Sequence, residues 1–327
     1  MEKDIYFDEN YGKLYERCEL GKAHVFKCET KNGIIINQFI KREIPITLNN
    51  VKYYDIVTPY GYGGPYIKEA SNKAELLNDY EKQFHEYCEN NNIVSEFIRF
   101  HPLFNNAKEM ESIYHPVYNR HTLGTNLKDY DDPVQSEFSK SCRKNIRKKI
   151  EMGMTYRVTN NPEDLSEFKK CYYSTMERNE ATDYYYFDDE YFNNIHRYYG
   201  KNTILVETLY ENKTIAAGLY YIYNGIIHIH LSGTLKEYLN LSPAYILRYG
   251  VTIWGKENGY KLIHHGGGRT SSEEDSLYQF KKQFAKNTSF DFFLGKKIWN
   301  ENIYNELCKK ANVSRNEEFF PAYRKSV

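Results

Sequence analysis

The chain lacks the features that mark secreted, membrane and nucleic-acid-coating proteins. None of its 327 residues lies in an apolar run of the roughly 18 residues that a membrane-spanning helix needs. No apolar segment follows the opening Met-Glu-Lys-Asp, so we expect no secretion signal. Lysine plus arginine and aspartate plus glutamate both number 44, so any nucleic acid would have to bind a local basic patch. We expect a soluble cytoplasmic protein.

Cysteine gives no sign of a disulfide framework or a zinc site. The six cysteines are scattered and form no C-x-x-C pair. In a cytosolic chain this pattern predicts free thiols. Histidine does not suggest a metal either: His228 and His230 alternate on a predicted strand, with no acidic residue close by. We therefore predict no bound metal, and we interpret these histidines as hydrogen-bonded strand residues.

The first half of the chain alternates strand and helix signals. Strands are predicted at 23–29, 34–40, 51–58 and 93–100, and a helix at 72–90. Asp132-Pro133 combines a capping residue with proline at the first helical position, so a helix should run from Asp132 to Met152 and end at Gly153. This basic helix is the expected connection, residues 133–153, between a first domain, 1–132, and a second domain, 154–327.

The second half has a clearer order of elements. Two helices, 162–178 and 188–199, precede three strands at 203–210, 215–224 and 226–232, and then follow a helix 243–258, a strand 261–265, a helix 274–284 and a strand 289–294. This is the order of the GNAT acyltransferase fold, in which the strands before and after the third helix splay apart to form a cleft. The expected fold class is α/β (α+β), with mixed, mainly antiparallel sheets.

Several motifs of this half resemble those of the Fem-type peptidyltransferases. They are His228-Ile-His230-Leu-Ser232-Gly-Thr234, Leu241-Ser242-Pro243-Ala-Tyr245-Ile-Leu247, Trp254-Gly-Lys256-Glu-Asn-Gly259-Tyr260, Gly266-Gly267-Gly268 and Leu277-Tyr-Gln-Phe280-Lys281-Lys282-Gln-Phe284. The resemblance covers roughly residues 50–295 and is weaker in the first domain. It implies two tandem GNAT-like domains, without the coiled-coil arm of some members because no heptad run occurs.

The resemblance also implies an activity. The family includes enzymes that move amino acids from aminoacyl-tRNA onto peptidoglycan precursors, so the expected activity is aminoacyl or acyl transfer to an amine of a cell-envelope peptide or amino-sugar precursor. No tightly bound cofactor is expected. Where GNAT enzymes hold the coenzyme A pyrophosphate with an Arg/Gln-x-x-Gly-x-Gly/Ala loop, this chain has Asn240 to Tyr245. Coenzyme A is therefore a less favoured donor. Carrier-protein thioesters and aminoacyl-tRNA are the alternative donors.

The resemblance places Lys281 at the reacting centre. A cation there would stabilise the tetrahedral oxyanion or the phosphate-ribose of tRNA. Helical spacing puts Lys281 beside the core and Lys282 closer to solvent, although both can equally be solvated charges. His265, at a strand end beside glycines, is a second candidate catalytic residue. The predicted substrate-binding residues of this half are His230, Ser242, Tyr245, Arg269 and Lys282. Ser242-Pro243 can form either an anion site or an ordinary helix cap.

Residues of the first half complete the predicted site. Arg99 and His101 lie on one face of a predicted strand, where Arg99 can hold a phosphate or carboxylate and His101 can act as a general base. A structural pair is equally consistent with the pattern. The glycine- and tyrosine-rich loop 59–66 supplies Tyr62 and Tyr66 as substrate-gripping residues. Its glycines do not fit a dinucleotide motif.

The predicted helix at 133–153 carries a basic face. Lysines and arginines between Lys140 and Lys149 interleave with Phe138, Cys142, Ile146 and Ile150, which predicts that the apolar face is buried. The exposed face can track a tRNA backbone or can simply be solvated. The rival of the enzyme hypothesis is a degenerate acyltransferase fold that acts as a binding module, and binding without turnover would favour it.

Overall fold

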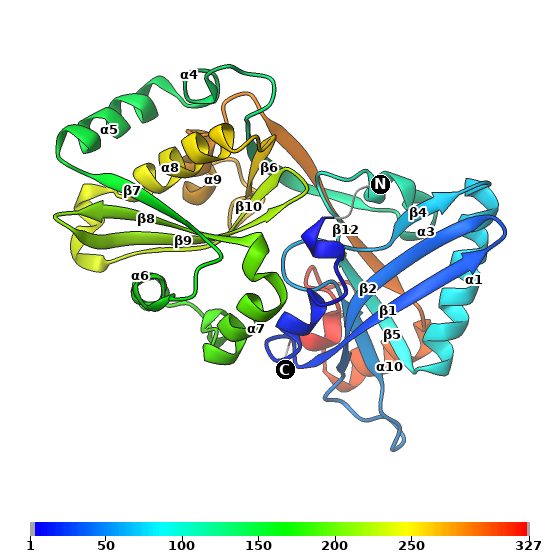
Figure 1. Ribbon diagram of the computed structural model, residues 1–327. Coiled ribbons are helices and arrows are strands. Elements are labelled where there is room, and N and C mark those ends of the chain that lie inside the picture. Colours follow the sequence, from blue (N-terminus) through cyan, green and yellow to red (C-terminus); the bar gives the residue numbers. More distant parts are fainter. Residues whose placement is uncertain (1–3, 326–327) are drawn as a thin grey trace. The chain divides into compact units, whose positions relative to one another are not determined.

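The computed structural model describes residues 4–325, and the chain divides into two compact units, which are traced in Figure 1. Unit 1 contains the residues up to Asn119 and those from Asp291 onward, and unit 2 contains Arg120–Phe290. This division differs from the expected one. The C-terminal segment joins unit 1 because β12 (Ser289–Ile298) pairs with β5 (Ile93–Arg99). A pairing between such distant segments leaves no local sequence signal.

Unit 1 is built on a sheet in the order β1-β2-β3-β5-β12, with β4 paired to β2. Its remaining strands are β1 (Gly21–Thr30), β2 (Gly33–Glu43), β3 (Tyr54–Val57) and β4 (Tyr66–Ala70). Of the strands that the structure describes in this unit, β3 and β5 run parallel, and the chain crosses between them through α1 (Lys73–Asn90). The short helices are η1 (Ile5–Phe7), η2 (Gly12–Tyr15), α2 (Asn106–Glu109), α3 (Glu111–Tyr114), α10 (Glu301–Lys310) and η6 (Ala322–Arg324).

Two apolar clusters form the core of unit 1. The stripe of α1 that includes Tyr80 and Phe84 packs with Phe39 of β2, as the helical spacing of its apolar residues predicts. Tyr304 of α10 packs in a second cluster with Val94 of β5. The sequence analysis did not predict α10 or β4.

A carboxylate lies inside the first of these clusters. Glu96 of β5 is 2% exposed and accepts hydrogen bonds from Asn37 Nδ2 at 2.8 Å, Tyr114 Oη at 3.0 Å and Trp299 Nε1 at 3.0 Å. Burial raises the pKa of Glu96 to about 7, although the three hydrogen bonds oppose the shift. Because this pKa lies above that of an unfolded glutamate, unit 1 loses stability as the pH rises through about 4.5 to 7.

We expect Glu96→Gln to stabilise unit 1 at alkaline pH. The variant should be more stable than the wild type at pH 8 by on the order of 1–3 kcal/mol and nearly equal to it at pH 5, since only the ionised carboxylate is penalised. Urea unfolding at both pH values, followed through the fluorescence of Trp299, checks this. A wild type that is the more stable of the two at pH 8 contradicts it.

Unit 2 contains strands in the order β6-β11-β10-β9-β8-β7. Its strands are β6 (Val117–Asn126), β7 (Thr155–Asn160), β8 (Thr203–Tyr210), β9 (Lys213–Tyr223), β10 (Ile226–Thr234) and β11 (Leu262–Gly266). The predicted meander β8-β9-β10 is present, and β10–β11 is the parallel pair. The expected fold class, mixed α/β with mainly antiparallel sheets, is confirmed.

Helices cover both faces of this sheet. Figure 1 shows α5, α8 and α9 on one side of it and α6 and α7 on the other. The helices and turns of this unit are α4 (Pro133–Glu137), α5 (Lys140–Glu151), α6 (Ser166–Arg178), η3 (Asp183–Tyr185), α7 (Asp189–Tyr199), η4 (Gly200–Asn202), η5 (Lys236–Leu241), α8 (Ala244–Glu257) and α9 (Ser276–Lys282). Among residues 4–325, no helix is long and apolar enough to cross a membrane.

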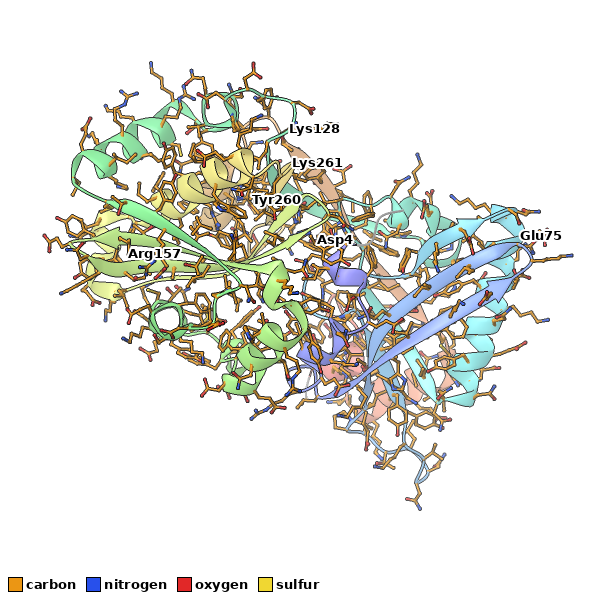
Figure 2. All side chains as sticks on the ribbon, in the orientation of Figure 1. Asp4, Glu75, Lys128, Arg157, Tyr260 and Lys261 are labelled. Atoms are coloured by element: carbon orange, nitrogen blue, oxygen red, sulfur yellow. The ribbon has the colours of Figure 1, made fainter. Side chains whose placement is uncertain are left out.

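Two strands at the edges of unit 2 were not predicted. β7 pairs with β8, and Figure 2 labels its Arg157, whose guanidinium donates to Glu207 at 2.7 and 2.9 Å. β6 pairs with β11, and Figure 2 marks the end of this pairing at Lys128 and Lys261, whose backbone groups are joined by a hydrogen bond of 3.1 Å. Both strands carry many polar residues, so the alternation of apolar and polar residues that would indicate a strand cannot be recognised in the sequence.

The single helix predicted from Asp132 to Met152 is wrong. Asp132 does cap α4, but Phe138 is extended and Ser139 caps a new helix by accepting from the Cys142 N–H. A second N-cap residue, Ser139, therefore starts a new helix at the point where a single helix was predicted to continue. Cys142 and Ile146 are buried as expected, whereas Ile150 is 45% exposed.

Candidate active site in unit 2

The strands β10 and β11 part at one end of the sheet. They are paired only from Ile226–Leu262 to His228–His264, although β10 continues to Thr234. A parallel pair that separates in this way exposes strand-end groups between its two strands. His265 follows the last paired residue of β11. Side chains from α8 and α9 join it there, so this end of the two strands is the candidate active site.

Lys281 reaches this place from α9. The helix starts at Asp275, whose carboxylate accepts from the Tyr278 N–H at 2.9 Å. Lys281, in the last turn, is partly buried, and its Nζ donates to the Gly267 carbonyl at 2.6 Å. Burial lowers the pKa of Lys281 to about 7, and the nearby Arg248 guanidinium adds to the effect. A lysine with such a pKa can serve as a cation or as a base near neutral pH.

His265 lies close enough to share this electrostatic environment. Its Nε2 is 2.7 Å from Thr125 Oγ1, and that hydroxyl donates to the Phe284 carbonyl at 2.7 Å. A hydroxyl has one proton to give, so Nε2 must carry the imidazole proton and Nδ1 holds the lone pair. Burial, followed by Arg248 and Lys281, lowers the pKa of His265 well below 6.5. The structure thus places Lys281 near a neutral His265.

Arg248 is the residue that the sequence analysis missed. It lies on α8 between the buried Leu247 and Val251, and it is only 6% exposed. Its Nη1 donates to the Tyr220 hydroxyl at 3.2 Å. An arginine in the buried stripe of an otherwise apolar helix was the available signal, because such a charge is costly to bury.

The glycine loop after β11 is held from several sides. Gly266 has a φ of 71°, which favours glycine, and a Cβ on Gly268 would lie 2.6 Å from Asp275 Oδ1. Arg120 Nη1 donates to the Gly268 carbonyl at 2.7 Å. These contacts fix the carbonyl of Gly267 that Lys281 contacts.

Comparison with known proteins gives a family match and a shared fold. The model of the FemAB family matches residues 76–211. The crystal structure of FemX superposes with a TM-score of 0.68 at 14% identity, over 93% of this chain and 94% of that chain. The chain thus resembles the Fem-type proteins, in sequence over residues 76–211 and in fold over most of its length.

Two further relatives extend the comparison. The UDP-N-acetylmuramoylpentapeptide-lysine N(6)-alanyltransferase of Weissella viridescens is 24% identical over 175 residues, which are 53% of this chain and 51% of the relative. The chain thus matches about half of the length of that enzyme. The structure of L-PGS from Bacillus licheniformis has a TM-score of 0.57 at 14% identity, covering 92% of this chain and 93% of that chain.

Other predicted residues of unit 2 lie around the cluster. Tyr245 donates from its hydroxyl to Gln283 Oε1 at 3.0 Å, and Lys149 lies 5.5 Å from the centre of its ring. Lys282 is partly buried, and Arg269 is exposed, with its N–H bonded to Asp275 Oδ2 at 3.1 Å. Ser242 does not cap α8 with its side chain. It has a φ of 49°, and Pro243 takes the N-cap position.

His230 lies on the other side of the sheet. Its Nε2 is 2.6 Å from the hydroxyl of Tyr191 of α7, and its ring stacks on Tyr221 with the centroids 4.5 Å apart. Burial lowers the pKa of His230 to about 3, so the ring is neutral. The structure therefore does not bring His230 to Lys281, because His230 faces α7 whereas Lys281 comes from α9, on the other side of the sheet (Figure 1).

The predicted residues of unit 1 hold a loop. His101 is buried, its Nδ1 accepts from the Leu103 N–H at 3.2 Å, and its Nε2 lies 3.6 Å from Asp4 Oδ2. Arg99 donates to the carbonyls of Thr58 and Pro59 at 2.6 and 3.3 Å. Both ring nitrogens of His101 already face partners, which favours the structural interpretation over a general base.

The loop tyrosines differ in their surroundings. The Tyr66 side chain is buried against Phe7, with the ring centroids 4.6 Å apart. Tyr62 is partly buried, 5.7 Å from the His101 ring. Tyr62 keeps the exposure that a substrate-gripping residue needs, and Tyr66 is part of the packing.

Proposed function

We propose that this Fem-type protein transfers an aminoacyl group from aminoacyl-tRNA to an amine of a cell-envelope peptide or amino-sugar precursor. The observation that supports it best is Lys281, a partly buried lysine at the place where β10 and β11 part, in a fold shared with FemX. The alanyltransferase of Weissella viridescens carries the corresponding chemistry in its name, alanyl transfer to a lysine N6. Because aminoacyl-tRNA is made in the cytoplasm, this donor places the reaction there.

The proposed chemistry needs little beyond positioning and charge. The acceptor amine attacks the ester carbonyl of the donor, the tetrahedral oxyanion forms, and the tRNA 3′ oxygen leaves as the amide forms. Protonated Lys281 would stabilise the oxyanion, and the amine proton would pass to the leaving oxygen directly or through a base. His265 is neutral and its Nδ1 carries a lone pair, so it can serve as that base.

The start of α8 supports aminoacyl-tRNA over coenzyme A. A pyrophosphate cradle needs free N–H groups at a helix N-terminus. Here Pro243 has no N–H, and the N–H groups of Tyr245 and Ile246 already donate to the carbonyls of Ser242 and Pro243 at 3.3 and 2.9 Å. The same contacts weaken the hypothesis of an anion site at Ser242.

The decisive experiment offers each donor separately. The full chain is incubated with labelled aminoacyl-tRNA or with labelled acyl-coenzyme A, using peptide and amino-sugar envelope precursors as acceptors. We expect label to move from aminoacyl-tRNA to the acceptor amine and none to move from the thioester. Transfer from acyl-coenzyme A, or binding of coenzyme A at micromolar concentration in calorimetry, would show that coenzyme A and not tRNA carries the transferred group. Acceptor binding without any transfer would favour the binding-module hypothesis.

We expect α5 to contact the tRNA backbone. Its exposed basic residues include Lys144, Arg147 and Lys148, and its buried face packs on α8. Replacing these three with glutamate should raise KM for aminoacyl-tRNA by about 10- to 100-fold. It should also flatten the salt dependence of KM, because each cation removed from the protein reduces the number of counterions that the RNA releases on binding. Turnover assays at several salt concentrations measure both effects.

A matched variant controls for net charge. Lys201, Lys213 and Lys286 are exposed residues of unit 2 outside α5, and their replacement with glutamate makes the same charge change. The control should leave KM within about twofold of the wild type. Equal effects of the two triple variants would show that α5 is merely a solvated face.

A further inference from the structure

Arg248 is a buried cation for which no residue in the described part of the chain supplies an anion. It is 6% exposed, and among the described residues its side chain has one hydrogen-bond partner, the neutral Tyr220 hydroxyl at 3.2 Å. Its Nε is buried and makes no hydrogen bond within residues 4–325. Leaving a buried charge uncompensated is strongly destabilising. A chain that keeps such a cation in a cleft commonly uses it to bind a ligand.

A second cation lies near it and is also poorly compensated. The guanidinium of Arg248 is close enough to act on both Lys281 and His265. The one carboxylate that favours the charged form of Lys281 is that of Asp275. Its oxygens already accept the N–H groups of Tyr278, Arg269 and Thr270, at 2.9, 3.1 and 3.1 Å. The carboxylate is thus committed to the helix cap and the glycine loop, and the cluster remains positive.

The available hydrogen-bonding groups are mostly donors. Arg248 offers its Nε–H, and Lys281 offers the protons not used on Gly267. The Tyr220 oxygen accepts from Arg248, so its own proton is free to be donated, and no described acceptor takes it. The acceptor among them is His265 Nδ1, which is also buried without a partner. An oxyanion can accept from three such donors, whereas a cationic or apolar group would satisfy none.

These groups come from different elements of the fold. Arg248 comes from α8, Lys281 from α9 and His265 from the residue after the last β10–β11 pair. We propose that Arg248, Tyr220 and Lys281 form a subsite for one oxyanion of the substrate, a carboxylate or a phosphate, at the point where β10 and β11 part. The subsite deepens the proposed function and depends on it only for the source of the anion.

Binding of inorganic phosphate tests the subsite without any turnover. Phosphate is titrated into the ¹⁵N-labelled full chain at constant ionic strength, with chloride as the balancing ion, and the Arg248 Nε–H signal is followed by NMR. We expect a saturable shift of that signal, together with a rise in melting temperature. Acetate should compete for the same signal. No saturable shift with either anion up to about 100 mM, an affinity too weak for a subsite, would overturn the proposal.

Variants localise the binding. Arg248→Met keeps the aliphatic volume and removes the donors, so phosphate affinity should fall at least about tenfold. Arg157→Met, on the edge strand β7, removes an arginine of the same unit and should leave the affinity unchanged. If Arg248→Met does not fold, Tyr220→Phe, which deletes only a hydroxyl, should weaken phosphate by about threefold to tenfold. If Arg248→Met folds and binds phosphate as tightly as the wild type does, the proposal is overturned. If it does not fold, unchanged phosphate affinity of Tyr220→Phe overturns the proposal.

Kinetics then identify the source of the anion. If the anion is a phosphate of the RNA, Arg248→Lys should raise KM for aminoacyl-tRNA by about tenfold, and a short RNA ending in CCA should displace phosphate. If it is a carboxylate of the peptide acceptor, KM for the acceptor rises and the RNA has no effect on phosphate. A fall in kcat with both KM values unchanged would make Arg248 an oxyanion donor of the transition state, which overturns the ground-state subsite. Phosphate binding without any transfer would refute the proposed function and leave the subsite standing.

Discussion

Lys281→Met should lower kcat by about 10²–10³ with no loss of thermal stability, because it removes one preorganised donor to the tetrahedral oxyanion. The melting temperature should hold or rise slightly, since a partly buried cation disappears together with its hydrogen bond to Gly267. Turnover assays beside melting curves measure both. Equal activity of the variant and the wild type would remove Lys281 from the mechanism, and a large fall in melting temperature would assign it a structural role.

The neighbouring lysine provides the matched control. Lys282 is on the same helix turn and partly buried, but it makes no contact with the glycine loop among the described hydrogen bonds. Lys282→Met should cost less than about threefold in kcat. If Lys282→Met is the more damaging variant, the roles of the two lysines are exchanged.

The pH dependence tests the charge state of Lys281. Its pKa of about 7 means that the cation is lost as the pH rises through 7, whereas the acceptor amine becomes a better nucleophile. The wild type should therefore lose the oxyanion contribution above pH 7. Lys281→Arg, which keeps its charge at every working pH, should lack this descending limb. If the rate of the arginine variant also falls above pH 7, the fall is due to another titrating group and not to Lys281.

Stability follows the same pKa with a defined sign. Between pH 7 and the unfolded pKa near 10.4, the unfolded state binds more protons at this position than the folded state. Lys281 therefore contributes a stability that rises with pH over this window. This slope should be absent in Lys281→Met, and a persisting slope would mean that Lys281 is not the group responsible.

Gly233→Ala should destabilise unit 2 by about 3 kcal/mol or more. A Cβ at Gly233 of β10 would lie 2.1 Å from the Cys171 carbonyl oxygen and 2.5 Å from the Tyr172 Cα. These are backbone atoms of α6, so no side-chain rotation relieves the overlap, and the helix must move. The helix is also tied to β10 by the Thr234 N–H, which donates to Thr175 Oγ1 at 2.9 Å.

Urea unfolding of the variant measures this cost. Gly63→Ala is the matched control, because a Cβ there would meet its nearest atom, Thr58 Cγ2, at 3.5 Å. The control should change the free energy of unfolding by less than about 1 kcal/mol. A Gly233→Ala variant within about 1 kcal/mol of the wild type would mean that α6 can withdraw from β10 at little cost.

The local signals of the sequence predicted unit 2 better than unit 1. The meander β8-β9-β10, α8, β11 and α9 were predicted at nearly the observed bounds, because turn residues and apolar periodicity are local. The break at Ser139 was missed, since both sides of it have helical composition and one serine decides the register of the next helix.

The candidate site divides in the same way. Lys281 was proposed from a motif of the Fem-type resemblance, and His265 from its place at a strand end beside glycines. Arg248 was missed because a single arginine in a helix is ordinary until its burial is known. His101 and Arg99 have the residue types of a site, but their ring nitrogens and guanidinium are engaged with Asp4, Leu103 and the loop carbonyls. Which polar groups have partners depends on segments that are distant in the chain.

The sequence by itself determined the Fem-type resemblance, the mixed α/β class and the order of elements around β10 and β11. These follow from local spacing and capping, which residues a few positions apart specify. The tertiary structure alone decided that the C-terminal segment returns to unit 1, that His230 and Lys281 lie on opposite faces of the sheet, and that Arg248 is buried beside Lys281. These facts depend on strand pairing and helix packing between distant segments. The free energy of such contacts is shared among many residues, so no single sequence motif predicts them.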